Sequence, residues 1–97
     1  MIKHIVLLKI KPNILEKTVI QCLEAVVGLK EKIRGIEDID FGKNNSHEDK
    51  NQGYTHGFTV YFKDEAARYF YLTHPAHQKV VKEHIEPIAS DVLVFDY

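Results

Sequence analysis

A helix is interrupted and restarted within the segment Tyr71-Leu72-Thr73-His74-Pro75-Ala76-His77. Pro75 cannot sit inside a regular helix, because its ring clashes with the preceding turn and it has no N–H to donate. It suits the first turn of a new helix, and it disfavours a helical conformation for His74. We therefore expect one short helix from Asp64 to about Leu72, with Asp64 as its N-cap, and a second from Ala76 to about Glu86.

Four strands are expected around this broken helix. Residues 2–10 form a mostly apolar, largely β-branched run, which is typical of a strand in the middle of a sheet. Residues 54–62 read as a second strong strand, whose even-numbered and odd-numbered residues lie on opposite faces. Shorter runs at residues 36–41 and 92–97 complete the set, and the polar residues 42–53 form the one long loop.

A further helix is expected between the first two strands. Asn13, followed by Glu16 three residues later, resembles a capping box at its start. Gly35 marks its end. The apolar stripe at helical spacing consists of Val19, Cys22, Leu23, Val26, Lys30 and Ile33, with Leu29 at its edge.

The resulting order, βαββαβ, predicts an α+β fold of the ferredoxin-like type. Two right-handed crossovers place both helices on one face of a four-stranded antiparallel sheet, with the first and third strands in the centre. The other face is left bare, and its patch of Ile5, Leu7, Thr59 and Tyr61 is larger than a monomer usually exposes. We predict that two copies pack sheet to sheet as a homodimer, a dimeric α/β barrel. A lone domain with a solvated sheet is the alternative.

Length and composition limit the class of protein. Ninety-seven residues predict a single domain, residues 1–97. Thirteen basic and fourteen acidic residues, without a block of five like charges, argue against nucleic-acid binding. The sequence has no apolar run of eighteen residues and no signal peptide, so we expect no association with a membrane. A single cysteine, Cys22, fits a reducing compartment, and we expect the protein to be cytoplasmic.

Histidines gather near the helix break. His4 and His56 lie on the even faces of the two central strands, so both should point toward the helix layer, where Tyr71 and His77 are expected. Each histidine taken alone is better explained as a core residue that bonds a backbone carbonyl. Two of them beneath a third histidine and a tyrosine predict a pocket with converging polar groups.

Several segments in combination resemble the stress-responsive A/B barrel (Dabb) domain family. They are MIKHIVL at residues 1–7, GYTH at 53–56, Tyr71 with HPAH at 74–77, and VLVFDY at 92–97. The resemblance covers essentially the whole chain. It implies a dimeric α+β barrel, the same packing that the bare sheet face predicts.

The resemblance also implies site residues. The family includes a cofactor-free polyketide cyclase in which a tyrosine and a histidine act as acid and base, and Tyr71 and His77 match their motif positions. His4 and His56 match the histidines that line the same pocket, and we include His74 with the predicted ligand-binding residues. Other members are heat-stable stress or antimicrobial proteins of plants without assigned chemistry, so the motif alone does not select an enzyme.

Three functions are considered, and metal binding is the least favoured of them. The favoured one is a stress-responsive barrel protein that binds a small apolar or carbonyl-bearing molecule between sheet and helices. The second is a cofactor-free enzyme, in which His77 takes a proton from a carbon flanked by carbonyls and Tyr71 donates a hydrogen bond to the enolate.

The third function is metal binding. His77 and His84 share a helix face, but no His-x-x-x-His or Cys-x-x-Cys spacing occurs. No phosphate-binding glycine motif follows a strand either. We expect neither a metal nor a cofactor.

Overall fold

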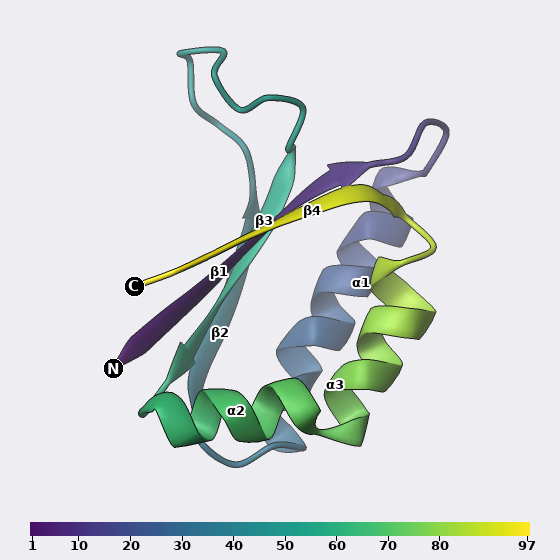
Figure 1. The fold of residues 1–97 in the computed structure, drawn as a ribbon. Coiled ribbons are helices and arrows are strands. Elements are labelled where there is room, and N and C mark those ends of the chain that lie inside the picture. The colour runs from purple at the N-terminus through teal and green to yellow at the C-terminus, as the bar shows by residue number, and fades with distance from the viewer.

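The computed structural model describes residues 1–97 and has the ferredoxin-like fold that the sequence predicts. One antiparallel sheet carries its strands in the order β2-β3-β1-β4 (Figure 1). The strands are β1 (Ile2–Ile10), β2 (Ile36–Lys43), β3 (His56–Phe62) and β4 (Ala89–Asp96). The helical segments are α1 (Glu16–Val27), the 3-10 turn η1 (Gly28–Glu31), α2 (Glu65–Thr73), α3 (Pro75–Val80) and the π-helical turn η2 (Val81–Ile85).

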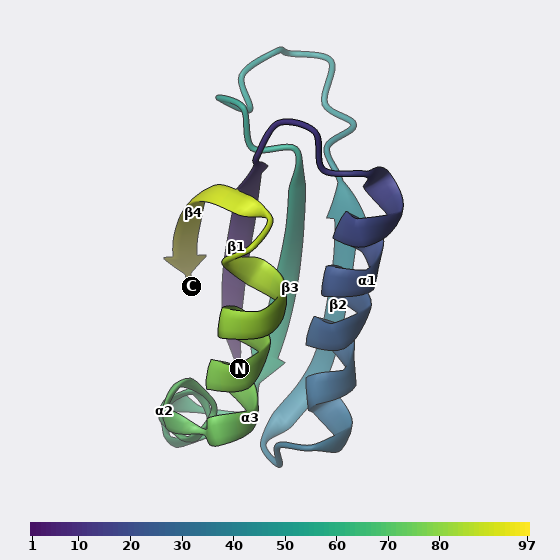
Figure 2. The ribbon, with the colours of Figure 1, turned by 90° about the vertical axis from the view of Figure 1, so that its right-hand side faces the viewer.

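The helices cover only part of the sheet. In Figure 2, which looks from the helix side, α1 and α3 stand in front of β2, β3 and β1, while β4 lies beyond them. The even-numbered residues of β3 are buried beneath this layer, and so are Val6 and Leu8 of β1. On β4, Val92 and Val94 stay 42% and 54% exposed. The sheet therefore has a closed half around β3 and an open margin along β4.

The break between α2 and α3 lies where the sequence predicts it. Asp64 caps α2, because its Oδ1 accepts from the backbone N–H of Ala67 at 2.9 Å. His74 is extended (φ −75°, ψ 135°), and its ring Nδ1 accepts from the Ala76 N–H at 3.0 Å to cap α3. Pro75 is the first residue of α3, where its missing N–H costs nothing. The two helices consequently meet at an angle (Figure 1).

Two predictions about α1 were wrong. Asn13 makes no capping box: its backbone is left-handed (φ 66°), and the N-cap of α1 is Leu15, without a side-chain hydrogen bond. Lys30 does not belong to the buried stripe. The helix tightens into η1 after Val27, and at three residues per turn Leu29 is fully buried while Lys30 turns outward.

The strand boundaries differ from prediction by one to three residues. β4 begins at Ala89 rather than Val92, β2 runs on to Lys43, and β3 begins at His56. An irregular register between Ile36 and Asp38 in β2 brings Ile36 and Ile39 into the core together. The long loop extends beyond the sheet (Figure 1). None of the helices combines the length and apolarity needed to cross a bilayer.

Candidate functional site

A pocket of about 730 Å³ lies between the α2–α3 break and the β1–β4 half of the sheet. This volume is in the range of small-molecule sites, which bury most of an apolar ligand. The lining comes from β1, β3, α2, α3, η2 and β4, so segments from across the chain close it. Its apolar wall consists of Val6, Phe58, Leu72, Val81, Ile85, Val92 and Val94.

Tyr71 and His77 form the polar centre of this pocket. Tyr71 comes from the last turn of α2 and His77 from the first turn of α3, and the bend at Pro75 brings their ring centres to 4.2 Å. Tyr71 is only 1% exposed. Burial alone raises the pKa of its hydroxyl well above the ordinary value of 10. Tyr71 is thus a protonated hydrogen-bond donor at neutral pH.

His77 is the hydrogen-bond acceptor beside the Tyr71 donor. Burial lowers the pKa of His77 from the ordinary 6.5. The backbone carbonyl of Leu72 raises this pKa by a smaller amount, and the nearby ring of His4 lowers it slightly. The Nδ1 of His77 is buried without a hydrogen-bond partner of good geometry. His77 lines the pocket, and a neutral imidazole can accept a hydrogen bond or a proton at one of its two ring nitrogens.

His4 enters the pocket from β1, and its ring is positioned by an ion-pair chain that consists of His4, Asp96 and Arg68. Its Nδ1 lies 2.9 Å from Asp96 Oδ1 on β4, and the other Asp96 oxygen accepts from Arg68 Nη1 on α2 at 3.0 Å. The rings of His4 and Tyr71 meet edge to face with centres 6.0 Å apart. Asp96 and Arg68 also line the pocket.

Sequence reasoning missed Arg68 and Asp96. Two signals could have found them. Asp96 has the same strand parity as Val92 and Val94, and Arg68 precedes Tyr71 by three residues, which places both side chains near one helix face. Their meeting with His4 joins residues 28 and 92 positions apart, which local patterns do not specify.

His56 lies elsewhere on the same sheet face. It pairs with Leu8 in the β1–β3 register, whereas His4 pairs with Val60. Its Nε2 lies 3.0 Å from Glu16 Oε2 at the start of α1, and its Nδ1 lies 2.8 Å from Thr55 Oγ1. His56 does not line the pocket.

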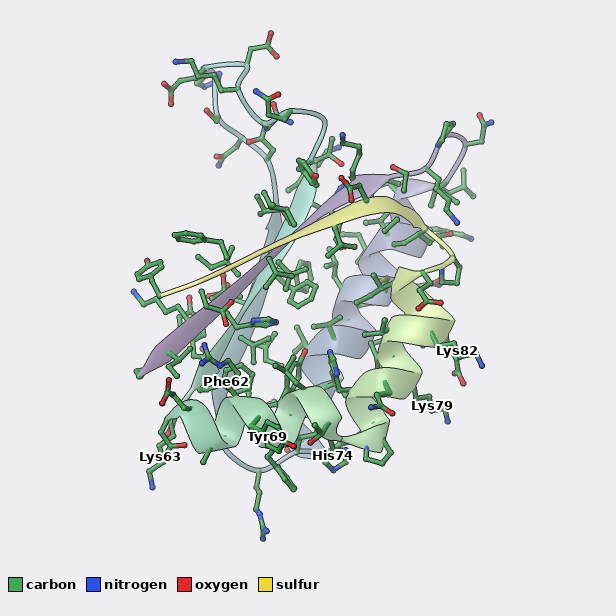
Figure 3. All side chains as sticks on the ribbon, viewed as in Figure 1. Phe62, Lys63, Tyr69, His74, Lys79 and Lys82 are labelled. Atoms are coloured by element: carbon green, nitrogen blue, oxygen red, sulfur yellow. The ribbon has the colours of Figure 1, made fainter.

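His74 also lies outside the pocket. Figure 3 shows it at the bend between α2 and α3, and its ring packs edge to face against Phe70 with centres 5.3 Å apart. It lines a separate recess of about 490 Å³ together with the basic residues Lys30, Lys32 and Arg34. The ligand-binding roles of His56 and His74 stay predictions. No three His, Cys, Asp or Glu side chains come together in a way that could hold a metal ion.

Comparison with known proteins places this geometry in context. A model of the family described as Stress responsive A/B Barrel Domain (Dabb) matches residues 2–97. Olivetolic acid cyclase of Cannabis sativa is 31% identical over 96 residues, which cover 99% of this chain and 94% of the cyclase.

Solved structures show the same architecture. A crystal structure of an Arabidopsis thaliana protein, 29% identical, superposes with a TM-score of 0.94 and covers 100% of this chain and 93% of that one. A dimeric ferredoxin-like protein of unknown function from a Jannaschia species, 25% identical, has a TM-score of 0.84 with coverage of 99% and 96%.

Proposed function

The chain belongs to the stress responsive A/B barrel domain (Dabb) family, and we propose that it binds a small, mostly apolar, carbonyl-bearing molecule in the pocket at the α2–α3 break. The observation that carries this proposal is the contact of a protonated Tyr71 with a neutral His77 inside an apolar cavity. Tyr71 would donate to the ligand carbonyl, and the aliphatic wall would cover the rest of the molecule.

The binding proposal is tested with Tyr71→Phe, which removes only the hydroxyl. Isothermal titration with 3-hydroxyacetophenone, a small aromatic ketone, should give an affinity about tenfold lower than wild type, because one hydrogen bond to a buried hydroxyl is lost. Tyr69→Phe is the matched control, since Tyr69 is 71% exposed two residues earlier on α2 (Figure 3). Equal affinities for wild type and Tyr71→Phe would contradict the proposal.

A cofactor-free enzyme is the second candidate, and the state of His77 favours it. A neutral histidine beside a tyrosine donor is the pair needed to enolise a ketone. His77 would take the proton from the carbon next to the carbonyl, and Tyr71 would stabilise the enolate oxygen until a proton returns to carbon. The relative named olivetolic acid cyclase agrees with chemistry of this class.

Deuterium exchange tests this second candidate. In heavy water, the methyl protons of 3-hydroxyacetophenone should exchange faster with the protein than in buffer alone, as read by proton NMR. His77→Gln should lower the protein-dependent rate by about 10²-fold or more. His84→Gln serves as control, because His84 lies on η2 outside the pocket lining. Exchange no faster than in buffer would leave ligand binding as the function.

We also propose that the chain works as a homodimer through the open sheet face. On that face Ile5 pairs with Phe95 and Leu7 with Leu93 across β1 and β4, which makes a continuous apolar surface. Leu93, Phe95 and Tyr97 are 46%, 64% and 65% exposed, more than a monomer usually leaves to water in one patch. The similar Jannaschia protein is described as dimeric.

Light scattering tests the dimer. The wild type should have twice the chain mass of 11.2 kDa, and Phe95→Glu should give the monomer mass, because a charge would be buried at the centre of the contact. Tyr69→Glu, which changes an exposed aromatic residue on α2, should leave the mass unchanged. A monomeric wild type at micromolar concentration would refute the proposal.

A further inference from the structure

The ion-pair chain behind His4 fixes which ring nitrogen carries the proton. An ionised carboxylate can only accept hydrogen bonds, so the 2.9 Å contact with Asp96 requires the proton on His4 Nδ1. Arg68 donates to the second oxygen of Asp96 and supplies the positive charge that balances it. His4 therefore need not be charged to satisfy Asp96. In the neutral ring, Nε2 is the bare nitrogen, and it can act only as an acceptor.

The remaining nitrogen of His4 is available to a ligand. His4 lines the pocket and is 6% exposed. Its ring makes one side-chain hydrogen bond, from Nδ1 to Asp96. Its ring centre lies 6.0 Å from that of Tyr71. Both side chains line the same pocket, so one small aromatic ligand can contact both of them. The pocket thus offers a donor, the Tyr71 hydroxyl, next to a fixed acceptor.

We propose that Arg68 and Asp96 are positioning residues, which make His4 a fixed acceptor that selects ligands carrying a hydroxyl group in addition to the carbonyl bound by Tyr71. This inference rests on the proposed binding function and names the ligand class: phenols or enols with a separate carbonyl group. A ligand whose hydroxyl is methylated presents no donor to His4, and it leaves that nitrogen without a partner.

The other charged groups of the pocket do not provide this selection. Asp91 is already bound by the Tyr54 hydroxyl at 2.6 Å. Glu86 is exposed at the far end of η2.

His77 is the other acceptor of the pocket, with its ring centre 4.2 Å from that of Tyr71, against 6.0 Å for His4. The Asp96→Asn and His4→Phe variants below leave His77 in place and therefore separate its contribution from that of His4.

The tautomer is tested directly by nitrogen NMR. A long-range proton–nitrogen spectrum of the ¹⁵N-labelled full chain at pH 8 should show the proton of His4 on Nδ1. In Asp96→Asn, the side-chain amide can donate to Nδ1, and the proton should move to Nε2, as it does when the aspartate of a Ser-His-Asp triad becomes asparagine. A wild-type His4 with its proton on Nε2 would overturn the proposal without any reference to ligand binding.

The selectivity is tested with a matched pair of ligands, 3-hydroxyacetophenone and 3-methoxyacetophenone. We expect wild type to bind the hydroxy compound about tenfold more tightly than the methoxy compound, and Asp96→Asn to lose this preference. Glu16→Gln, which changes the carboxylate that contacts His56 outside the pocket, should keep it. His4→Phe removes the acceptor but keeps the ring, so it should also lose the preference and provides a second variant should Asp96→Asn fold poorly.

The outcomes distinguish failure of the proposed binding function from failure of the role assigned to His4. Failure of both compounds to bind wild type refutes the proposed function and this inference with it. Equal binding of both compounds by wild type leaves the function standing and overturns the role of His4. A hydroxyl preference that survives in Asp96→Asn or in His4→Phe overturns the inference as well. The contacts from Arg68 through Asp96 to His4 would then only stabilise the packing of β4 and β1 against α2.

Discussion

His4 and His56 face the same helix layer from adjacent strands, and each contacts a carboxylate, yet only His4 lines a pocket. Their exposures are almost equal, 6% and 5%. The difference lies along the strand. In the β1–β3 register His56 sits opposite Leu8, four residues from His4, or about 13 Å at the rise of a strand.

The two ends of the sheet are closed in different ways. At the His56 end, the start of α1 brings Glu16 onto Nε2, and Thr55 occupies Nδ1, so both ring nitrogens are bonded within the chain. At the His4 end, the bend between α2 and α3 leaves a cavity, and only Nδ1 is bonded. A buried histidine with two protein partners holds the fold, whereas one with a single partner beside a cavity is available to a ligand.

The largest expected effect comes from truncating the two histidines in turn. His56→Ala should lower the free energy of unfolding by about 2–3 kcal/mol, because it leaves a hole in a closed region and strips partners from Thr55 and Glu16. His4→Ala should cost about 1 kcal/mol, since its ring borders a cavity where water can replace it as the partner of Asp96, and Arg68 stays bonded to the other Asp96 oxygen. Urea unfolding of both variants measures the difference.

Ligand titration provides the converse measurement on the same two variants. Binding of 3-hydroxyacetophenone should weaken about tenfold in His4→Ala and stay at the wild-type level in His56→Ala. If His4→Ala and His56→Ala lost equal stability and equal ligand affinity, the assignment of His56 to the fold and of His4 to ligand binding would be wrong.

The sequence predicts the fold better than it predicts element ends. The apolar run of β1, the two faces of β3 and the proline at position 75 predict the order and the faces, because those patterns are set locally. The prediction at Asn13 failed because the chain turns there with a left-handed backbone and α1 starts later, with Leu15 as N-cap, so Glu16 is its first residue and contacts His56. Lys30 was misplaced because a 3.6-residue period was continued through a 3-10 turn.

The same limit applies to the site. Tyr71 and His77 come together at the proline bend, as a local motif predicts, and His4 joins them from the expected sheet face. Strand parity places His4 and His56 on one face but says nothing about their position along it, which depends on register. Arg68 and Asp96 were missed because their contacts depend on how the last strand pairs with the first.

A smaller effect is expected at His74, the histidine that caps α3 outside the pocket. His74→Ala should cost about 1 kcal/mol of stability, since the Ala76 N–H loses its acceptor, and should leave ligand affinity unchanged. His74→Asn is the control, because asparagine caps helices well and should restore most of the stability. Weaker ligand binding in both variants would instead support the ligand-binding role predicted for His74.

The smallest expected effect is the pH dependence of the free energy of unfolding that His77 causes. His77, unlike His4 and His56, has no carboxylate bonded to its ring. Burial lowers the pKa of His77 in the folded state below the ordinary 6.5, so the unfolded chain takes up this proton first as the pH falls. Stability is therefore complete above about pH 6.5 and declines between 6.5 and the lowered pKa, where unfolded chains bind more protons than folded ones. Urea unfolding from pH 7.5 to 5 should show a shallower decline in His77→Gln than in wild type, because the variant lacks this proton. Identical slopes would mean that burial does not lower the pKa of His77 in the folded state, and the proposal of a neutral His77 in the pocket would lose that support.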